Sequence, residues 1–332
     1  MMKNPLVSII IPTFNRYLIV RETLRSILNQ TYLNWECLIV DDGSSKNDFV
    51  EILKFSKKDD RFILLQRPNS RLKGANACRN YGIEHTRGDF IIFFDSDDLM
   101  GITCLENRVN TFKNYKEYDF LVFSMGHFIE ESNCYLDKNR KSINLSNKKT
   151  IEEFLFSSVL PWQVSRPIFK SELIKNKICF NENMHNFQDD EFNVRVLANL
   201  KLKYKSIDIT DSYYRMELSN IKKYDNLIGK QNILNSYYEY TKTMFSILDS
   251  VQILNNRNSI LVRLFLTFRS NISKGTKLKN VRKALNLINK KIKLSFKEFF
   301  YFYFLILLNK FFHNKKGYYR TTQYIKNKIV NE

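Results

Sequence analysis

Short apolar runs alternate with helix-spaced apolar residues over the first third of the chain. Four runs have the length of a strand and are apolar on both faces; they cover 6–11, 37–40, 62–65 and 90–94. Buried strands separated by helices are typical of a parallel sheet covered on both sides. The pattern therefore predicts an α/β fold, with a mostly parallel, Rossmann-like sheet flanked by helices.

The pattern becomes mixed in the middle of the chain and helical towards its end. The elements expected in the middle are a strand at 118–128, a polar loop at 132–148, a helix near 151–158, a strand around Ile168, a helix at 189–200 and two short strands near 204–207 and 213–216. After about residue 224 only helices are predicted. We therefore expect an α/β domain at 1–220 and a helical, basic C-terminal region at 221–332.

Polar segments follow three of the four predicted strands. They are Pro12-Thr13-Phe14-Asn15, Asp41-Asp42-Gly43-Ser44 and Asp95-Ser96-Asp97-Asp98. In open parallel sheets, ligands bind beyond the carboxyl ends of the strands. Carboxylates gathered there repel one another unless a cation or hydrogen-bond donors compensate them. The segments form a candidate ligand site, although Asp, Gly and Ser are also the ordinary residues of tight turns.

Asp95 and Asp97 are the strongest candidates for metal binding, because residues at i and i+2 leaving a strand can project to the same side. Mg²⁺ and Mn²⁺ prefer such oxygen ligands and share them with substrate phosphates. A solvated, Asp-rich turn explains the pair equally well. Asp98 is expected to cap the following helix, since Asp is a preferred N-cap residue.

A helix start at about residue 75 could hold a diphosphate through its backbone N–H groups and the Arg79 guanidinium. A glycine such as Gly74 before a helix is ordinary, so this segment alone identifies no ligand.

Four motifs, taken in order, resemble those of inverting family 2 glycosyltransferases with the GT-A fold, of the bacterial surface-polysaccharide type. They read SIIIPTFNR, LIVDDGSS, GANACRNYGIEHTRGDFIIFFDSDD and FQDDEFNVR. The resemblance is close over about residues 5–100 and looser to about 216. It implies an enzyme of the hexosyltransferase type, which moves a sugar from a nucleotide-sugar donor, expected to be a UDP-sugar, to a hydroxyl of a glycan or lipid-linked acceptor with inversion.

The resemblance also implies roles for individual residues. The nucleotide-binding residues would be Pro12, Thr13, Asn15, Asp41, Asp42, Arg79, Asp95 and Ser96. Either acid of the Asp41-Asp42 pair could contact the uracil or ribose, and Asp42 is favoured for the base. Asp97 would bind the divalent metal, Mn²⁺ or Mg²⁺.

The general base implied by the resemblance is Asp189. The family commonly has Glu-Asp at this point, with an arginine six residues beyond the Asp, and here Arg195 stands at that spacing. Gln188 replaces the usual Glu, which leaves Asp190 as a second candidate. A carboxylate in the first turn of a helix is also favoured by the helix dipole alone.

The charge is concentrated at the C-terminal end. The net charge is +19, and residues 270–332 hold fifteen Lys and Arg against two acids. The five cysteines include no CxxC pair, which argues against a disulfide framework or structural zinc. No apolar run reaches the roughly 18–20 residues of a membrane span, and no secretory signal is recognised. We expect a cytoplasmic protein.

An aromatic run at 299–308 lies between Lys297 and Lys310. Such a segment suits the surface of an anionic inner membrane leaflet, which would make the protein peripheral at the inner face of the cytoplasmic membrane. A buried helix or a homodimer contact is the alternative.

Two other function classes each fit part of the sequence. A nucleotidyltransferase or another sugar-nucleotide enzyme generally needs a glycine-rich, basic loop after the first strand, which Pro12-Thr13-Phe14-Asn15 is not. A basic nucleic-acid-binding protein would fit the C-terminal charge. It leaves the strand-end carboxylates unexplained, since these repel phosphates, so no nucleic acid is expected as a partner.

Overall fold

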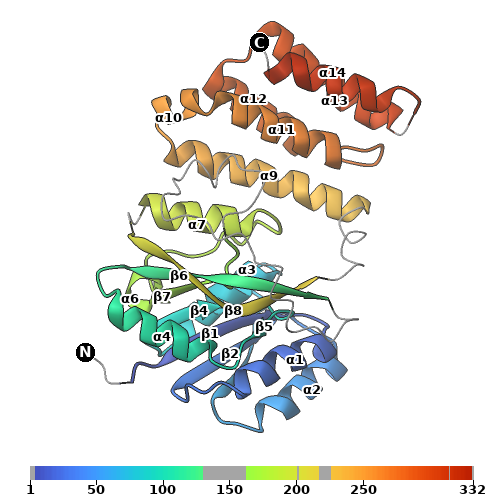
Figure 1. Cartoon of the computed structure of the whole chain (residues 1–332). Helices are drawn as coiled ribbons and strands as arrows, with labels where there is room; N and C mark the ends of the chain where they lie inside the picture. Colours follow the sequence, from blue (N-terminus) through green and yellow to red (C-terminus); the bar gives the residue numbers. More distant parts are fainter. Residues whose placement is uncertain (1–3, 130–161, 200–201, 217–225, 314, 331–332) are drawn as a thin grey trace. The chain divides into compact units, whose positions relative to one another are not determined.

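The computed structural model describes residues 4–129, 162–199, 202–216, 226–313 and 315–330 (Figure 1). These residues form two compact units. The first takes in the described residues up to 182 and those of 196–216, and the second takes in 183–195 and the described residues from 226 onwards. The domain boundary near residue 220 stays a prediction. The loop expected at 132–148 and the helix expected near 151–158 lie outside the described residues.

One eight-stranded sheet forms the centre of the first unit, with the order β3-β2-β1-β4-β7-β6-β8-β5. The strands are β1 (Val7–Thr13), β2 (Trp35–Asp41), β3 (Phe62–Gln66), β4 (Phe90–Phe93), β5 (Leu99–Met100), β6 (Phe120–Ile129), β7 (Pro167–Lys170) and β8 (Tyr204–Met216). The first four are parallel, β7 is antiparallel to β4 and β6, and β8 is parallel to β6. The predicted α/β fold with helices flanking the sheet is confirmed (Figure 1).

Alternation of side chains along β1 gives the two faces of the sheet different helical covers. The helices of this unit are α1 (Tyr17–Leu28), α2 (Lys46–Ser56), α3 (Ala75–His85), α4 (Cys104–Asn114) and α6 (Ser171–Ile174). Ile9 belongs to the main core together with side chains of α1, α2 and α4. Ile10 points to the other face, where a Cβ at Gly82 of α3 would lie 2.5 Å from its Cγ2 atom. Glycine therefore allows α3 to pack closely on β1.

The prediction of two short strands near 204–207 and 213–216 is wrong, because a single strand, β8, runs through both. Its pairing with β6 shifts register on either side of Ser124. Such an irregularity interrupts the two-residue period on which the prediction depended. The short elements β5 and α6 were missed because they hold too few residues to show a period.

Helices make up the second unit from residue 226 onwards, as predicted. They are α9 (Leu227–Ile247), α10 (Ser250–Asn255), α11 (Arg257–Asn271), α12 (Lys279–Ile292), α13 (Phe296–Phe312) and α14 (Tyr318–Val330). α11 packs against α9, α13 and α14 and buries Leu264, Phe265 and Phe268 completely. None of the helices in the described ranges has both the length and the apolar character needed to cross a membrane.

A fully buried ion pair ties α4 to β8 in the first unit. The Nε and Nη2 atoms of Arg108 donate to the two carboxylate oxygens of Asp211 at 2.8 and 2.9 Å. Both side chains are 0% exposed. The two-pronged geometry compensates each charge inside the protein, where an unpaired charge is very costly.

Asp211→Ala is expected to lower the free energy of unfolding by about 3–5 kcal/mol, because it leaves the Arg108 guanidinium buried without its partner. Urea denaturation followed by circular dichroism measures this loss. Glu51→Ala is the control, since it removes the exposed Glu51–Lys54 pair of the same unit and should leave the midpoint nearly unchanged. Equal effects of the two substitutions would contradict the assignment.

Candidate active site

The carboxyl ends of β1, β2 and β4 lie along one edge of the sheet. Thr13 ends β1 in register with Asp41, which ends β2, and the Asp42 N–H donates to the Thr13 carbonyl oxygen at 2.9 Å. The β1–β4 pairing stops earlier, at Ile10 and Phe93. Pro12 has no N–H with which to extend that pairing. The strands therefore separate where the polar segments begin.

Two buried oxygen atoms at this edge, Thr13 Oγ1 and Asp41 Oδ1, have no hydrogen-bond partner within the described ranges. The other carboxylate oxygen of Asp41 accepts from the N–H groups of Gly43 and Ser44, each at 3.0 Å. A buried polar atom without a partner costs about 1–3 kcal/mol. Thr13 and Asp41 thus offer a hydroxyl and a carboxylate oxygen to a polar ligand.

Asp42 is already held by two protein donors. Its Oδ1 atom accepts from Arg67 Nε at 2.5 Å and from the Gly74 N–H at 3.2 Å. Arg67 follows β3, and Gly74 directly precedes α3. Asp42 therefore joins three segments of the site.

Asn15 fixes the loops after β1 and β2 to each other. It has a positive φ of 48°, which Asn adopts more readily than most residues. Its N–H donates to Ser44 Oγ at 2.9 Å, and its side-chain oxygen accepts from the Ser45 N–H at 2.7 Å. These bonds hold Thr13 and Asp41 in fixed positions.

Asp95 receives a buried guanidinium from α3. Arg79 Nη2 donates to Asp95 Oδ1 at 2.6 Å, and Arg79 Nη1 donates to Asn76 Oδ1 at 3.2 Å. The Arg79 Nε atom is buried without a hydrogen-bond partner in the described part of the chain. The helix thereby brings positive charge to the end of β4, where a phosphate could use it.

Asp97 pairs with an arginine that is itself partly exposed, unlike the buried Arg79 beside Asp95. Its Oδ2 atom accepts from Arg16 Nη1 at 3.0 Å, and the two side chains are 29% and 30% exposed. Arg16 Nη1 also donates to Ser96 Oγ at 3.4 Å. The Ser96 carbonyl accepts from the buried hydroxyl of Thr23 on α1 at 3.0 Å. The turn is thus attached to α1 while the Asp97 carboxylate stays accessible.

The prediction that Asp98 caps the next helix is wrong. Asp98 is buried, and its two carboxylate oxygens accept from Ser165 Oγ at 3.2 Å and from the Arg215 N–H at 3.3 Å. Burial, together with the neighbouring Asp95 and Asp97, raises the pKa of the Asp98 carboxyl well above its ordinary value. β5 separates Asp98 from α4, so the residue fixes the turn from inside instead of capping a helix.

Three residues that the sequence analysis did not find support the turn: Ser165, Arg108 and Arg215. Ser165 Oγ accepts from the Asp95 N–H at 3.2 Å, and the Ser165 carbonyl accepts from Arg108 Nη1 at 3.2 Å. Arg215 Nε donates to the Asp97 carbonyl at 2.9 Å. No local spacing connects these residues with the turn.

No group of three His, Cys, Asp or Glu side chains is placed to hold a metal ion in the described ranges. Mg²⁺ and Mn²⁺ do not require such a group, because they commonly bind one or two carboxylates together with water and substrate phosphates. The accessible carboxylate of Asp97 fits this mode of binding.

The second unit contains the acidic first turn of α7 (Gln188–Asn199). Arg263 Nη2 donates to Asp190 Oδ2 at 2.8 Å, and burial raises the pKa of the Asp190 carboxyl despite this partner. Glu191 accepts two bonds from Arg195, each at 2.7 Å. Asp189 directly precedes these two residues and is less buried than either.

The residue before α7 has an unusual backbone. Phe187 has a φ of 58°, which is rare for a bulky residue and costs free energy unless the surroundings enforce it. Its ring packs against Tyr237 and Tyr240 of α9, with ring centroids 5.8 and 5.5 Å apart. α9 thus fixes the direction in which the acidic turn begins.

The sequence-predicted residues of the first unit, from Pro12 to Asp97, lie along a single edge of the sheet. Asp189 belongs to the second unit.

Comparison with known proteins identifies the family. The family described as "Glycosyl transferase family 2" matches residues 8–177. A glycosyltransferase of Methanocaldococcus jannaschii, itself uncharacterized, is 32% identical over 241 residues, which are 71% of this chain and 79% of the relative. The UDP-Glc:alpha-D-GlcNAc-diphosphoundecaprenol beta-1,3-glucosyltransferase WfgD of Escherichia coli is 41% identical over 109 residues. That match covers 33% of this chain and less than half, 42%, of the relative.

Among solved structures, S. aureus TarS 1-349 in complex with UDP-GlcNAc has the same fold, with a TM-score of 0.62 and 16% identity. The match covers 98% of this chain and 90% of TarS 1-349. The family match covers more than half of the chain, and it includes the strand ends that carry Thr13, Asp41, Asp95 and Asp97. This chain, a transferase with a GT-A-like fold, belongs to glycosyl transferase family 2.

Proposed function

We propose that the protein transfers a sugar from a nucleotide-sugar donor, a UDP-sugar, to a hydroxyl of a lipid-linked glycan in surface-polysaccharide synthesis, with inversion at the anomeric carbon. The observation that carries the proposal is the pair of unpartnered buried oxygens, Thr13 Oγ1 and Asp41 Oδ1, at the ends of β1 and β2, together with Arg79 and Asp97 at the end of β4. They offer hydrogen bonds to the nucleoside, while Arg79 and a metal at Asp97 offer positive charge to the diphosphate. The undecaprenol-linked acceptor named for WfgD supports the acceptor class.

In this proposal the nucleoside binds at the ends of β1 and β2, near Thr13, Asp41 and Asp42. Arg67 and Gly74 already donate to Asp42 Oδ1. We therefore assign the main carboxylate contact with the nucleoside to Asp41 Oδ1. The other carboxylate oxygen of Asp42 would make a weaker, additional contact. Pro12 and Asn15 keep the loop in place. Asp95 and Ser96 line the ribose side, and Arg79 faces the diphosphate.

Asp97 would hold the divalent cation, Mn²⁺ or Mg²⁺. When bound, the cation neutralises the charge that develops on the departing diphosphate. For Asp97 to bind it, the Arg16 guanidinium has to release the Asp97 Oδ2 atom, which the exposure of both side chains allows. Arg16 is then free to turn towards the phosphates.

Asp189 would be the base that takes the proton from the acceptor hydroxyl. A carboxylate that is ionised at neutral pH can accept that proton. Asp190 is the weaker candidate, because a buried ion pair with Arg263 already engages it. A base on the sugar face opposite the diphosphate gives in-line displacement, and therefore inversion.

The proposed membrane attachment rests on α13, which carries an exposed stripe of large apolar side chains. Phe296, Phe300, Leu307 and Phe311 are 87%, 58%, 51% and 60% exposed and recur at helical spacing along one face. At 100° per residue, Lys297 lies on one side of this stripe and Lys310 on the other. Apolar residues between lysines suit the interface of an anionic bilayer.

A second copy of the chain suits this stripe less well. Residues 270–332 carry fifteen basic residues against two acids, so pairing two copies there would bring like charges together. An anionic lipid surface would instead attract them. Peripheral attachment through α13 would bring the enzyme to a lipid-linked acceptor.

Asp189→Asn is expected to abolish sugar transfer while leaving UDP binding within about twofold, because it removes only the proton acceptor. Radiolabelled-sugar transfer and calorimetry with UDP measure the two effects. Asp190→Asn is the comparison variant; it should lower thermal stability through loss of the Arg263 pair but keep transfer per folded molecule. Equal loss of binding and transfer in Asp189→Asn would move the base role to another residue.

Asp97→Asn is expected to reduce Mn²⁺-dependent transfer at least roughly 100-fold, since the leaving diphosphate loses about 3 kcal/mol of charge stabilisation. A titration of activity with Mn²⁺ after EDTA treatment tests this. Asp60→Asn, at an exposed position in the same unit, has the same charge change and should behave as the unchanged enzyme. A variant Asp97→Asn that still responds fully to Mn²⁺ would remove Asp97 from the metal site.

The triple variant Phe296→Ser, Phe300→Ser and Phe311→Ser should bind phosphatidylglycerol-containing vesicles roughly 100-fold more weakly. The reason is that it loses the free energy gained when three phenylalanine side chains move from water into the lipid. The control is the triple variant Leu227→Ser, Val251→Ser and Leu254→Ser, which changes exposed apolar residues elsewhere in the same unit. Vesicle flotation measures binding, and light scattering measures the oligomeric state. Unchanged flotation with a loss of dimers would assign the stripe to a homodimer.

A further inference from the structure

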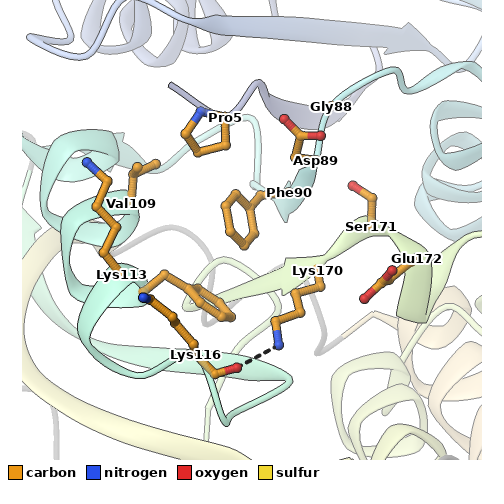
Figure 2. Close-up of a pocket in the computed structure, with 11 residues that line it drawn as sticks. Pro5, Gly88, Asp89, Phe90, Val109, Lys113, Lys116, Lys170, Ser171 and Glu172 are labelled. Atoms are coloured by element: carbon orange, nitrogen blue, oxygen red, sulfur yellow. Dashed lines mark hydrogen bonds between the residues drawn. The ribbon is translucent and has the colours of Figure 1, made fainter. Parts of the chain in front are cut away.

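A hollow lies in the first unit at the edge of the sheet opposite the strand ends that carry the candidate active site. It has a volume of about 410 Å³. Pro5 before β1 and Gly88 and Asp89 before β4 form one side of it, and α4 and the end of β7 form the other (Figure 2). Because β1 and β4 begin here and carry the candidate active site at their other ends, the two sites are separate.

Aromatic and aliphatic side chains form the floor of this hollow. The Phe90 ring stands in its centre in Figure 2, and the Phe112 ring packs against it with ring centroids 4.8 Å apart. Val109 of α4 completes the floor and is almost fully buried. An apolar floor of this size accommodates a flat or branched apolar group.

Three lysines line the hollow: Lys113, Lys116 and Lys170. Lys170 Nζ lies over the Phe112 ring, 5.6 Å from its centroid, and donates to the Lys116 carbonyl oxygen at 3.0 Å. Two acids, Asp89 and Glu172, also line it. Asp89 is engaged, because its carboxylate accepts from the Leu6 N–H at 2.8 Å. The lysine side is therefore the part suited to an anion.

Ser171 supplies an independent sign of a ligand. The residue is 6% exposed, and its hydroxyl has no hydrogen-bond partner among the residues that the structure describes. Its backbone N–H is satisfied by the Asp89 carbonyl at 2.9 Å. Figure 2 shows this side chain on the wall between Asp89 and Glu172. A buried hydroxyl with no partner at the wall of a hollow is a donor without an acceptor.

We propose that this hollow is a second binding site, distinct from the donor site, for a small amphipathic anion. The apolar body of the ligand lies against Phe90 and Phe112. Its carboxylate or phosphate group pairs with Lys116 and Lys170, and an oxygen atom accepts from Ser171 Oγ. The inference does not depend on the transfer reaction, since it rests on binding alone.

Phenyl phosphate is the first probe, and benzoate, benzyl alcohol and inorganic phosphate separate the contributions of its parts. Calorimetry and ligand-observed NMR on the full chain should show binding of phenyl phosphate and benzoate at least tenfold tighter than of benzyl alcohol or inorganic phosphate. Saturating UDP should not displace phenyl phosphate. Displacement by UDP, or equal binding of all four probes, would overturn the proposal, and neither result bears on the transfer reaction.

Variants test the wall residues separately. Ser171→Ala should leave the melting temperature of the free protein unchanged or raise it, since the unpartnered hydroxyl is lost, and should weaken phenyl phosphate binding roughly fivefold. Lys116→Met should weaken phenyl phosphate binding roughly tenfold. Lys57→Met, outside the hollow, should leave that binding unchanged. Unchanged affinity in both Ser171→Ala and Lys116→Met would refute the site.

Discussion

Carboxylates can gather at the carboxyl ends of β2 and β4 because three of them have a guanidinium partner. Arg67 pairs with Asp42, Arg79 with Asp95 and Arg16 with Asp97. Without these arginines, the acidic edge would repel itself and would also repel the phosphates of a nucleotide. The arginines come from three different segments, so the same ion pairs that neutralise the edge also fix the loops around it.

The three pairs differ in how open they are, and this difference gives them different uses. Both side chains of the Asp42 pair are 8% exposed, which suits an anchor. The Asp95 pair has a buried arginine and a half-exposed carboxylate. Of the three, only the Asp97 pair has both side chains partly exposed, so in the proposed function it is the pair that exchanges its partner for a metal ion and a diphosphate. Burial raises the pKa of the Asp98 carboxyl, which lies behind them, well above its ordinary value.

The second unit is held together by apolar packing between helices. Its helices bury apolar faces against α11, yet α13 presents aromatic residues outward between two lysines. A helix that is apolar on both sides can pack against the protein core with one side and against a lipid surface with the other. The proposed attachment to a lipid surface and the proposed binding of a lipid-linked acceptor are therefore consistent with each other, although they rest on different observations.

The sequence by itself determined the order of strands and helices as far as β4, because each buried strand there is a continuous apolar run. It also located the ends of β1, β2 and β4 and the polar residues that stand there, among them Thr13, Asp41 and Asp97. The tertiary structure decided the partners: Arg16 for Asp97, Arg67 for Asp42, and Ser165 for Asp98. These contacts join residues 25 to 81 positions apart, and no periodicity or local spacing records them. The burial of Asp98 and the continuity of β8 escaped prediction for the same reason, because each depends on what a distant segment places beside it.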